Sequence, residues 1–430
     1  MMLTFEYRIK PSPKQAQCID HWLELLRRHW NYALGQRLDW LRRTRCTIDR
    51  CSLISEPIGE IPQKVNYYSQ QSDLKQTKIL FPDYKDIYCE VQQINIQRLD
   101  KAWKRWLVPD KKGKRGGRPR FKKAGQLRSF SFSRVNHPKS VIKFQDNSIW
   151  TRKWGVIPVI VHRRIPDDFS LKTATIVRCA DGYYVCLTAE EETVPTLLPK
   201  DKIQSAVGID VGLKDFLTTS KGETVAVKKI YRNRQNYLAR QQRKLARKVK
   251  GSKNHEKQQK TIALTHQKIK RHRKDWHYKT AHWLVKNYDF IAGEDLNIKG
   301  LARTKLAKST HPSSSPPGRG WGWVGNFLMK LEAVAVKRGV WFVKVSPHGT
   351  TINCSNCGHK VPKTLSVRLQ ECPSCNLTMD RDENAAINIL KKALEIHGVG
   401  HILSAWVGLV DRQPVNQETS YSECIQLSLF

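Results

Sequence analysis

The spacing of apolar residues divides the amino-terminal half of the chain into three regions. Residues 3–10 alternate between apolar and polar side chains as a β-strand does, and two prolines end that pattern. Apolar residues then recur with the helical period from Ile19 and again around Trp103, on either side of a polar, turn-rich stretch at about 46–83. Residues 120–195 alternate again and contain the hairpin sequence ADGYY. The predicted regions are a strand at residues 1–10, a helical domain at 11–108 and a β-rich barrel or sheet at 109–200.

The carboxyl-terminal half contains short apolar strands that end at acidic residues. Residues 206–219 predict a strand, a tight turn and a second strand, with Asp210 at the end of the first. Another short strand at 290–292 is followed by Glu294. Between the two, helix-forming residues with a GSKN break predict a helical hairpin at 231–285. The predicted regions are 201–350 for these strands and helices, 351–379 for a cysteine-rich segment, 380–398 for a further helix and 399–430 for a tail without an interpretable motif.

The charge of the chain points to a nucleic acid partner. Its 76 Lys and Arg against 38 Asp and Glu give a formal charge of +38 and a pI of about 9.9, which attracts phosphate backbones. Ribosomal and chromatin proteins can be as basic, but they are usually shorter and have fewer Trp than the 13 found here. An anionic membrane surface is the weaker alternative, because no apolar run has the length of a membrane span.

The cysteines and the first residues indicate a reducing cytosol. Seven of the 11 Cys are scattered outside paired motifs, which suits free thiols better than disulfides. The opening sequence MMLTFEYRIK alternates as a strand and lacks the apolar centre of a signal peptide. We therefore expect a cytoplasmic protein.

Two basic segments are candidates for contact with nucleic acid. Residues 110–123, DKKGKRGGRPRFKK, are either a solvated linker or a loop whose cations reach phosphates while Gly lets the backbone approach. Residues 231–275 carry 16 Lys or Arg against Glu256 and Asp275, which favours a nucleic-acid groove over a merely solvated face. The candidate contact residues are Arg118, Arg120 and Lys122 in the first segment and Arg240, Arg243, Lys244 and Arg247 in the second.

Two CxxC pairs predict a structural zinc site. The pairs are separated by 14 residues, a spacing close to that of zinc ribbons, in which each pair forms a knuckle with two thiolates on one side of a turn. The predicted ligands are Cys354, Cys357, Cys372 and Cys375. A closed shell of four sulfurs leaves no position for water or substrate, so we expect one zinc ion that stabilises the fold and takes no part in catalysis.

Three carboxylates are candidates for a second, catalytic metal site. Asp210, Glu294 and Asp382 each close a segment that we expect to meet the others in one mixed sheet. Oxygen ligands without His prefer Mg²⁺ or Mn²⁺, and two such ions about 4 Å apart could activate a water in phosphodiester cleavage. Any one of these acids alone is more often a cap or an exposed turn. Asp380 competes with Asp382, which we prefer because it stands at the start of a helix, leaving Asp380 as a helix-entry or supporting group.

Four motifs in this order resemble the transposon-encoded TnpB family. They are GIDVGLKDF, GEDLNIKGL, CSNCG with CPSC, and DRDENAAINIL, and the likeness extends over nearly the whole chain. The resemblance implies a RuvC-like nuclease of RNase H fold, interrupted by a zinc-binding insertion, and a wedge β-barrel that carries a helical recognition domain. The fold class is thus a multidomain protein with α/β and β parts. It also implies an RNA-guided DNA endonuclease, whose guide RNA comes from the transposon end and pairs with double-stranded target DNA.

The resemblance assigns roles to particular residues. The acidic triad of the family falls on Asp210, Glu294 and Asp382, and its zinc ligands fall on the four cysteines. A glutamine that reads the short DNA motif beside the target falls on Gln93. The implied protein works in the prokaryotic cytosol, associates with the nucleoid when on DNA, and is a monomer on its RNA.

Three other functions share some of these features. A guide-dependent DNA-binding protein without cleavage is disfavoured, because all three carboxylates are present. A compact type V CRISPR effector has the same nuclease motifs, but the chain length and the simple helical domain favour the transposon protein. A transposase that joins strands is disfavoured, since no tyrosine stands in a context of two histidines and apolar residues.

Overall fold

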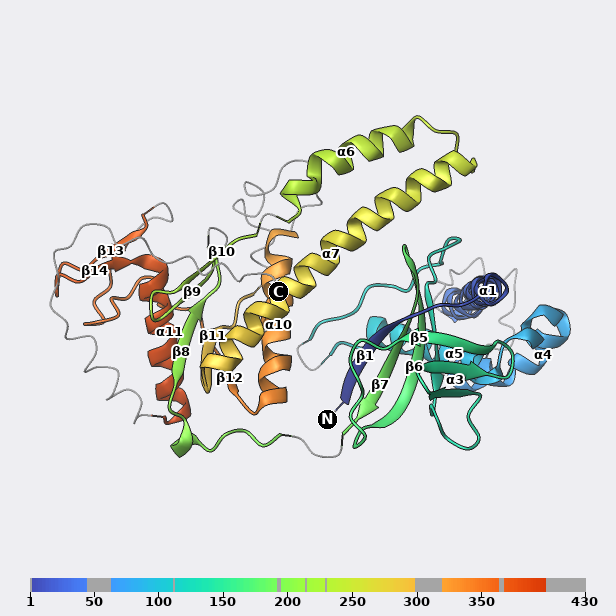
Figure 1. Cartoon of the computed structure of the whole chain (residues 1–430), viewed down its shortest axis with the longest axis horizontal. Helices are drawn as coiled ribbons and strands as arrows, with labels where there is room; N and C mark the ends of the chain where they lie inside the picture. The colour runs from blue at the N-terminus through green and yellow to red at the C-terminus, as the bar shows by residue number, and fades with distance from the viewer. Residues whose placement is uncertain are drawn as a thin grey trace, which may run out of the picture. The chain divides into compact units, whose positions relative to one another are not determined.

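The computed structural model describes most of the chain as two units. The described residues are 2–44, 63–110, 113–191, 195–212, 215–228, 230–297, 319–362 and 367–399, without the side chains of 319–323. The units are Met1–Thr193 and Val194–Phe430, and each has its own sheet and apolar core (Figure 1). Among these residues no helix has the length and apolarity needed to cross a membrane. All but the first residue of the tail at 399–430 lies outside the described residues.

The first unit has two long helices that follow the predicted apolar stripes. Its helices are α1 (Pro13–Thr44), α3 (Tyr67–Ser72), α4 (Leu74–Leu80), the 3-10 helix η1 (Pro82–Asp86) and α5 (Cys89–Leu107). The stripes of α1 and α5 meet through Trp30, Leu34, Leu99 and Trp103, all of them buried. Apolar spacing therefore fixed both the position of these helices and the faces by which they pack.

The prediction of a turn-rich stretch at 46–83 was wrong over α3 and α4. Asn66 caps α3 by accepting two backbone N–H hydrogen bonds, of 2.8 and 3.0 Å. Inside α3, the buried Gln70 donates a hydrogen bond of 2.7 Å to the carbonyl oxygen of Ala33 in α1. Caps and polar contacts, which leave no apolar period in the sequence, hold α3 in place. Residues 45–62 lie outside the described part of the chain.

The sheet of the first unit is antiparallel. Its strands are β1 (Met2–Ile9), β2 (Ser129–Ser133), β3 (Ile142–Gln145), β4 (Ser148–Thr151), β5 (Gly155–Ile160), β6 (Ser170–Cys179) and β7 (Gly182–Glu190). They pair in the order β2-β6-β7-β1-β5-β4-β3. The ADGYY turn joins β6 to β7, as predicted. Hydrogen bonding gives a continuous sheet with β2 and β3 at its ends, and closure into a barrel stays a prediction.

The sheet of the second unit is mixed. Its strands are β8 (Ala206–Asp210), β9 (Asp215–Thr219), β10 (Thr224–Ala226), β11 (Phe290–Glu294) and β12 (Trp341–Val345), in the order β10-β9-β8-β11-β12. The pairs of β11 with β8 and β12 are parallel, whereas those of β9 with β8 and β10 are antiparallel. The strand, turn and strand expected at 206–219 are confirmed in β8 and β9.

Helices cover both faces of this sheet. The helices of this unit are the 3-10 helix η2 (Lys200–Lys202), α6 (Arg232–Ala246), α7 (Lys253–Asn287), α10 (Arg319–Arg338) and α11 (Arg381–His397), of which α7, α10 and α11 pack on the sheet. On β8 and β11, Val207, Ile209 and Ile291 pack with α7 and α10, while the alternating Phe290 and Ala292 pack with α11. The unit is therefore three layers, with α11 on the face that carries the even-numbered residues of β8 and β11.

The backbone of α11 lies directly on β8. A Cβ atom added to Gly208 would stand 2.0 Å from the carbonyl oxygen of Ala386, a distance that no side chain permits. The two elements run side by side along their length (Figure 1). Glycine at this strand position thus sets how closely α11 approaches the sheet.

A small two-stranded sheet precedes α11. Its strands are β13 (Leu369–Glu371) and β14 (Thr378–Asp380), which pair antiparallel around the second cysteine pair. The chain passes from β14 straight into α11, without a loop. The cysteine-rich segment is therefore joined directly to the helix that covers the sheet of this unit.

Candidate active site and zinc centre

Asp210 and Glu294 end two neighbouring strands. β8 and β11 run parallel with Ala292 opposite Gly208, so the carboxyl ends of both strands lie at the same edge of the sheet. Side chains alternate between the faces of a strand, and both acids therefore share the face of Gly208 and Ala292, which α11 covers. Strand register thus brings together two predicted acids from distant parts of the chain.

Asp382 belongs to the first turn of α11, just after the helix cap. Asp380 is that cap, because its Oδ1 accepts hydrogen bonds from the backbone N–H of Asp382 (2.8 Å) and of Glu383 (3.3 Å). Asp380 therefore has the helix-entry role expected of it. The side chain of Asp382 is therefore not used to cap the helix.

The charges of the three acids act on one another. The pKa of Asp210 is raised to about 8 by burial and by the negative charges of Glu294 and Asp382, against a lowering by Arg381. Burial also raises the pKa of Glu294, while the hydroxyl of Thr350, which donates to it at 2.6 Å, lowers it. Three carboxylates thus form one region of negative potential at the sheet edge.

Two arginines contact Asp382. Arg368 Nη1 lies 3.1 Å from its Oδ2, and Arg381 Nη2 lies 3.0 Å from its Oδ1. Among the described residues, the carboxylates are not gathered into a compact cluster of metal ligands as the cysteines are. Sequence reasoning missed both arginines, although Arg381 stands inside the DRDENAAINIL motif and Arg368 lies four residues before Cys372.

The donor set of the acidic site fits a hard divalent cation. Asp210, Glu294 and Asp382 offer carboxylate oxygens, which Mg²⁺ and Mn²⁺ prefer. Burial is the main cause of the raised pKa of Asp210, and the neighbouring negative charges add a repulsion that a bound cation would relieve. The acidic site thus matches these cations in the chemistry of its ligand atoms.

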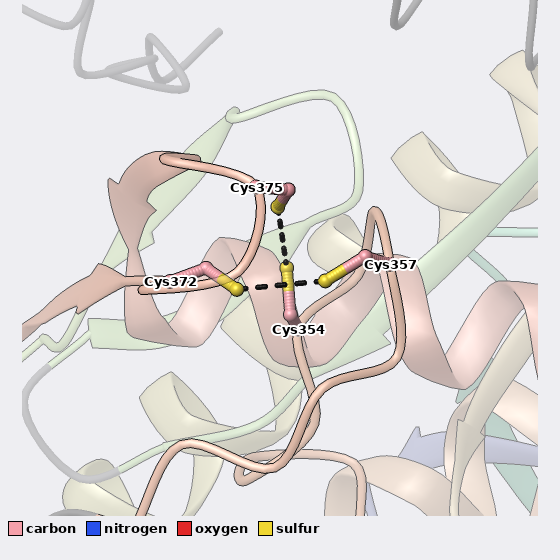
Figure 2. Close-up of side chains that lie close together, drawn as sticks. All are labelled: Cys354, Cys357, Cys372 and Cys375. Atoms are coloured by element: carbon pink, nitrogen blue, oxygen red, sulfur yellow. Dashed lines mark hydrogen bonds between the residues drawn. The ribbon is translucent and has the colours of Figure 1, made fainter.

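The four predicted cysteines form a compact cluster. Their Sγ atoms all lie within 4.8 Å of one another, and Figure 2 shows the four sulfurs turned toward a common centre. Cys354 and Cys375 are 3.6 Å apart, and Cys357 and Cys372 are 3.5 Å apart, measured between sulfurs. A tetrahedron with zinc–sulfur bonds of about 2.3 Å has sulfurs about 3.8 Å apart, so this cluster fits zinc. Hydrogen bonds lower the pKa of the Cys357 thiol to about 6, which favours the thiolate form that metals bind.

Comparison with known proteins places the chain in a family. Three family models match it: a probable transposase over residues 184–305, a Cas12f1-like TNB domain over 325–389, and a helix-turn-helix domain over 1–46. The "Putative RNA-guided DNA endonuclease InsQ" of Escherichia coli (strain K12) is 29% identical over 345 residues, which cover 78% of this chain and 80% of the relative. A "Putative RNA-guided DNA endonuclease" of Streptomyces pristinaespiralis is 27% identical over 92% of this chain and 90% of its own.

A third relative carries the family name. The "TnpB-like protein L79" of Acanthamoeba polyphaga mimivirus is 34% identical over 215 residues, which cover 47% of this chain and 40% of the relative. This chain belongs to the TnpB family. The family models and the relatives together span both units, so the TnpB likeness includes the acidic site and the cysteine cluster.

Gln93, the TnpB residue expected to read DNA, lies on α5 between two cavities of the first unit. One cavity has a volume of about 380 Å³ and is also lined by Tyr67 and Arg134; the other, of about 390 Å³, is also lined by Tyr68. Its amide donates a long contact of 3.6 Å to the sulfur of Cys89. The position is accessible, and the reading role stays a prediction.

The basic run at 110–123 is not a detached linker where the structure describes it. Lys122 is fixed by its backbone, which donates 2.8 Å to Asn31 Oδ1 and accepts 2.8 Å from Arg27 Nη1 on α1. The Lys122 ammonium lies 4.3 Å from the centre of the Trp30 ring, whereas the side chain of Arg118 is exposed. The run is thus held along the helices by its backbone, and contact of its cations with phosphates stays a prediction. Arg120 is also exposed.

The predicted cations of the basic hairpin are on its surface. α6 and α7 lie side by side in the hairpin (Figure 1), and the buried residue of α6 is Leu238. Four exposed cations follow one another along α6 and just beyond it: Arg240, Arg243, Lys244 and Arg247. This surface is available to a phosphate backbone.

Proposed function

We propose that this TnpB-family chain is an RNA-guided DNA endonuclease that hydrolyses phosphodiester bonds at Asp210, Glu294 and Asp382. The observation that carries the proposal is that Asp210 and Glu294 end neighbouring parallel strands on the face covered by α11, and that the charge of Asp382 in the first turn of α11 acts on Asp210. Two relatives that align with most of the chain are named as RNA-guided DNA endonucleases. The mixed sheet, with helices on both faces, supports an RNase H fold of the RuvC type.

The residues of the chain would prepare the site in a definite way. Asp210 and Glu294 are fixed by parallel strands, which hold carboxylates more rigidly than loops do. The first turn of α11 presents Asp382, whose charge already acts on Asp210. Two Mg²⁺ or Mn²⁺ ions bound by these groups would supply an activated water and stabilise the leaving oxygen of the DNA strand. The guanidinium groups of Arg368 and Arg381 stand beside this site, where the substrate phosphate would bring negative charge.

Zinc would bind at a separate site and have a structural role. The four sulfurs fit one zinc ion in a closed shell, which leaves no position for a water or a substrate. Little of the segment between Cys354 and Cys375 is buried apolar surface, so the ion would hold the ribbon folded.

Guide RNA and double-stranded target DNA are the proposed partners. The charge of +38, the exposed cations of α6 and the held basic run at 113–123 support binding to phosphate backbones. In the proposed division of labour, residues 1–10 and 109–200 form the wedge domain, 11–108 the recognition domain with Gln93 at the DNA, 201–350 and 380–398 the nuclease, and 351–379 the zinc ribbon. We propose that one chain acts on one RNA.

RNA that co-purifies with the protein tests the guided function. The chain is expressed with its flanking DNA, and the bound RNA is sequenced. We expect one discrete species that carries sequence from the transposon end, because the guide is proposed to come from there. Bulk ribosomal RNA without such a species would contradict the proposal, and would reduce the basic surface to unspecific attraction for RNA.

A further inference from the structure

Thr350 connects the cysteine-rich segment to the acidic site. Its side chain is buried, at 2% exposure, and its Oγ1 donates a 2.6 Å hydrogen bond to Glu294 Oε1. The same oxygen lies 3.0 Å from the carbonyl oxygen of Pro347, in the loop that precedes the first knuckle. A carboxylate held by a hydroxyl at this distance has one oxygen fixed in direction.

Asn388 of α11 holds the backbone of Thr350. Its Nδ2 donates 2.9 Å to the carbonyl oxygen of Thr350 and 2.7 Å to that of Asn353. Asn384, one turn earlier on the same face of α11, donates 2.8 Å to the same oxygen of Asn353. Two asparagines of one helix face thus fix the loop from Thr350 to Asn353.

The same loop carries the first zinc ligand. Cys354 follows Asn353 directly, and the N–H of the next residue, Ser355, donates 2.8 Å to Asn384 Oδ1. Lys391 of α11 donates 2.5 Å to the carbonyl oxygen of Ser355. Both neighbours of Cys354 are therefore hydrogen-bonded to α11, the helix that also presents Asp382.

Because these hydrogen bonds are buried or partly buried, losing one of them costs free energy. Asn384 is fully buried, and a buried donor or acceptor that loses its partner costs about 1–3 kcal/mol. The loop consequently has one favoured position on α11, and Thr350 has one favoured position beside Glu294. A change at Asn388 would therefore affect Glu294 through Thr350.

We propose that Thr350 is a positioning residue for Glu294, and that Asn388 ties its position to the zinc knuckle at Cys354. The zinc ribbon then does more than stand beside the active site, because it sets the direction of one carboxylate before a catalytic cation binds. This inference rests on the proposed function only in assigning a divalent cation to the three acids.

Binding of Mn²⁺ to the zinc-loaded full-length protein tests this inference without a cleavage assay. Mn²⁺ affinity is measured by electron paramagnetic resonance for Thr350→Val, which keeps the shape but removes the hydroxyl, and for Thr350→Ser, which keeps the hydroxyl. Loss of a group that orients a metal ligand weakens affinity by about 10-fold or more, and we expect this for Thr350→Val. Thr350→Ser and the neighbouring Thr351→Val are expected to bind as the wild type does.

A second pair of variants tests the connection to the ribbon. Asn388→Ala is expected to weaken Mn²⁺ binding as Thr350→Val does, although its side chain donates its hydrogen bonds to the loop carbonyls of Thr350 and Asn353. Asn356→Ala, at an exposed position of the same ribbon, is the control and is expected to bind normally. Zinc content is measured for every variant, and a loss of zinc in Thr350→Val would overturn the inference, since a general collapse of the ribbon would then explain the result.

Asp210→Ala distinguishes the failure of this inference from the failure of the proposed function. If Asp210→Ala loses Mn²⁺ while Thr350→Val binds normally, the positioning role is wrong and the acidic metal site stands. If Asp210→Ala binds Mn²⁺ as the wild type does, the metal site at the three acids is wrong, and the positioning role falls with it.

Discussion

At the scale of single residues, the buried carboxyl of Asp210 opposes the stability of the fold. Its carboxyl is enclosed at the end of β8 beside two further acids, so its charged form is disfavoured and its pKa rises from 3.8 to about 8. In the unfolded chain the same group ionises near its ordinary pKa. Without added divalent cations, the folded protein therefore binds one more proton than the unfolded chain between about pH 4 and pH 8.

This difference predicts a pH-dependent effect of Asp210→Asn. Because the folded state holds the extra proton, the free energy of unfolding of the wild type falls as the pH rises through that window. Asparagine cannot ionise, so the variant escapes this loss. Without added divalent cations, we expect the Tm of Asp210→Asn to exceed that of the wild type at pH 8, and the two to converge toward pH 4.

Thermal unfolding by circular dichroism across this pH range is the measurement. Asp168→Asn, an exposed acid of the first unit, is the control and is expected to follow the wild type at every pH. Wild type and Asp210→Asn with the same difference in Tm at pH 4 and pH 8 would contradict the raised pKa of Asp210.

The sequence revealed the acids and cysteines but not their partners. Asp210 and Glu294 stand out because each ends an apolar strand, and the cysteines because their spacing is that of a metal site. Thr350 and Arg368 are ordinary residues in the sequence, and their importance arises only from contacts with Glu294 and Asp382. Contacts of this kind depend on tertiary structure, which no local pattern encodes.

At the scale of elements, the packing of α11 on β8 determines the geometry of the acidic site. Gly208 leaves room for the backbone of α11 at Ala386, while Asp210 lies two residues further along the same strand. Leu390 also lies close to the same position, with its Cβ 2.9 Å from an added side-chain carbon. A side chain at position 208 of β8 would therefore displace α11, the helix that carries Asp382.

Gly208→Ala is accordingly expected to destabilise the second unit. A methyl group 2.0 Å from a backbone oxygen forces α11 away from the sheet, and overpacking of this kind costs about 1–3 kcal/mol or more. Urea unfolding of the purified protein measures the change. Gly293→Ala on the neighbouring strand is the matched control, because its added Cβ would meet a ring carbon of Phe342 at an ordinary 3.4 Å. Equal destabilisation by the two substitutions would contradict this packing argument.

Elements were predictable where an apolar period marks them. The strands β8 and β11 and the helices α1 and α5 follow such a period, and the sequence identifies them. α3 and α4 were missed because α3 depends on the Asn66 cap and on polar contacts of Gln70. The order of the strands in the mixed sheet could not be derived from spacing, since pairing between β8 and β11 joins distant segments.

At the scale of the whole molecule, the excess positive charge must be reconciled with a compact fold. A charge of +38 repels itself, and a bound polyanion would relieve the repulsion. The cations of α6 are exposed on a helix that has Leu238 as its buried residue. Such a helix is better explained by a partner than by the packing of its own side chains.

The basic hairpin is expected to contribute to the salt dependence of RNA binding. The slope of log K against log salt concentration is negative. Replacement of four cations of the hairpin by Gln should make it less steep, by about 0.7 for each lost phosphate contact. The four cations are Arg240, Arg243, Lys244 and Arg247. Filter binding at several salt concentrations measures the slope for the co-purified RNA.

A charge-preserving variant is the control for this experiment. The substitutions Arg240→Lys, Arg243→Lys and Arg247→Lys keep the number of charges, so the slope is expected to stay that of the wild type. If the Gln variant also keeps the wild-type slope, α6 is a solvated surface and not part of the RNA site.

Cleavage directed by an altered guide tests the central claim most directly. The purified protein is loaded with an RNA whose target-pairing segment has been replaced, and plasmids with the old or the new target are incubated with Mg²⁺. We predict that the wild type cuts only the plasmid that matches the loaded RNA, and that Asp210→Ala binds this plasmid without cutting it. Cutting that ignores the guide, or cutting by Asp210→Ala equal to that of the wild type, would contradict an RNA-guided nuclease centred on Asp210, Glu294 and Asp382.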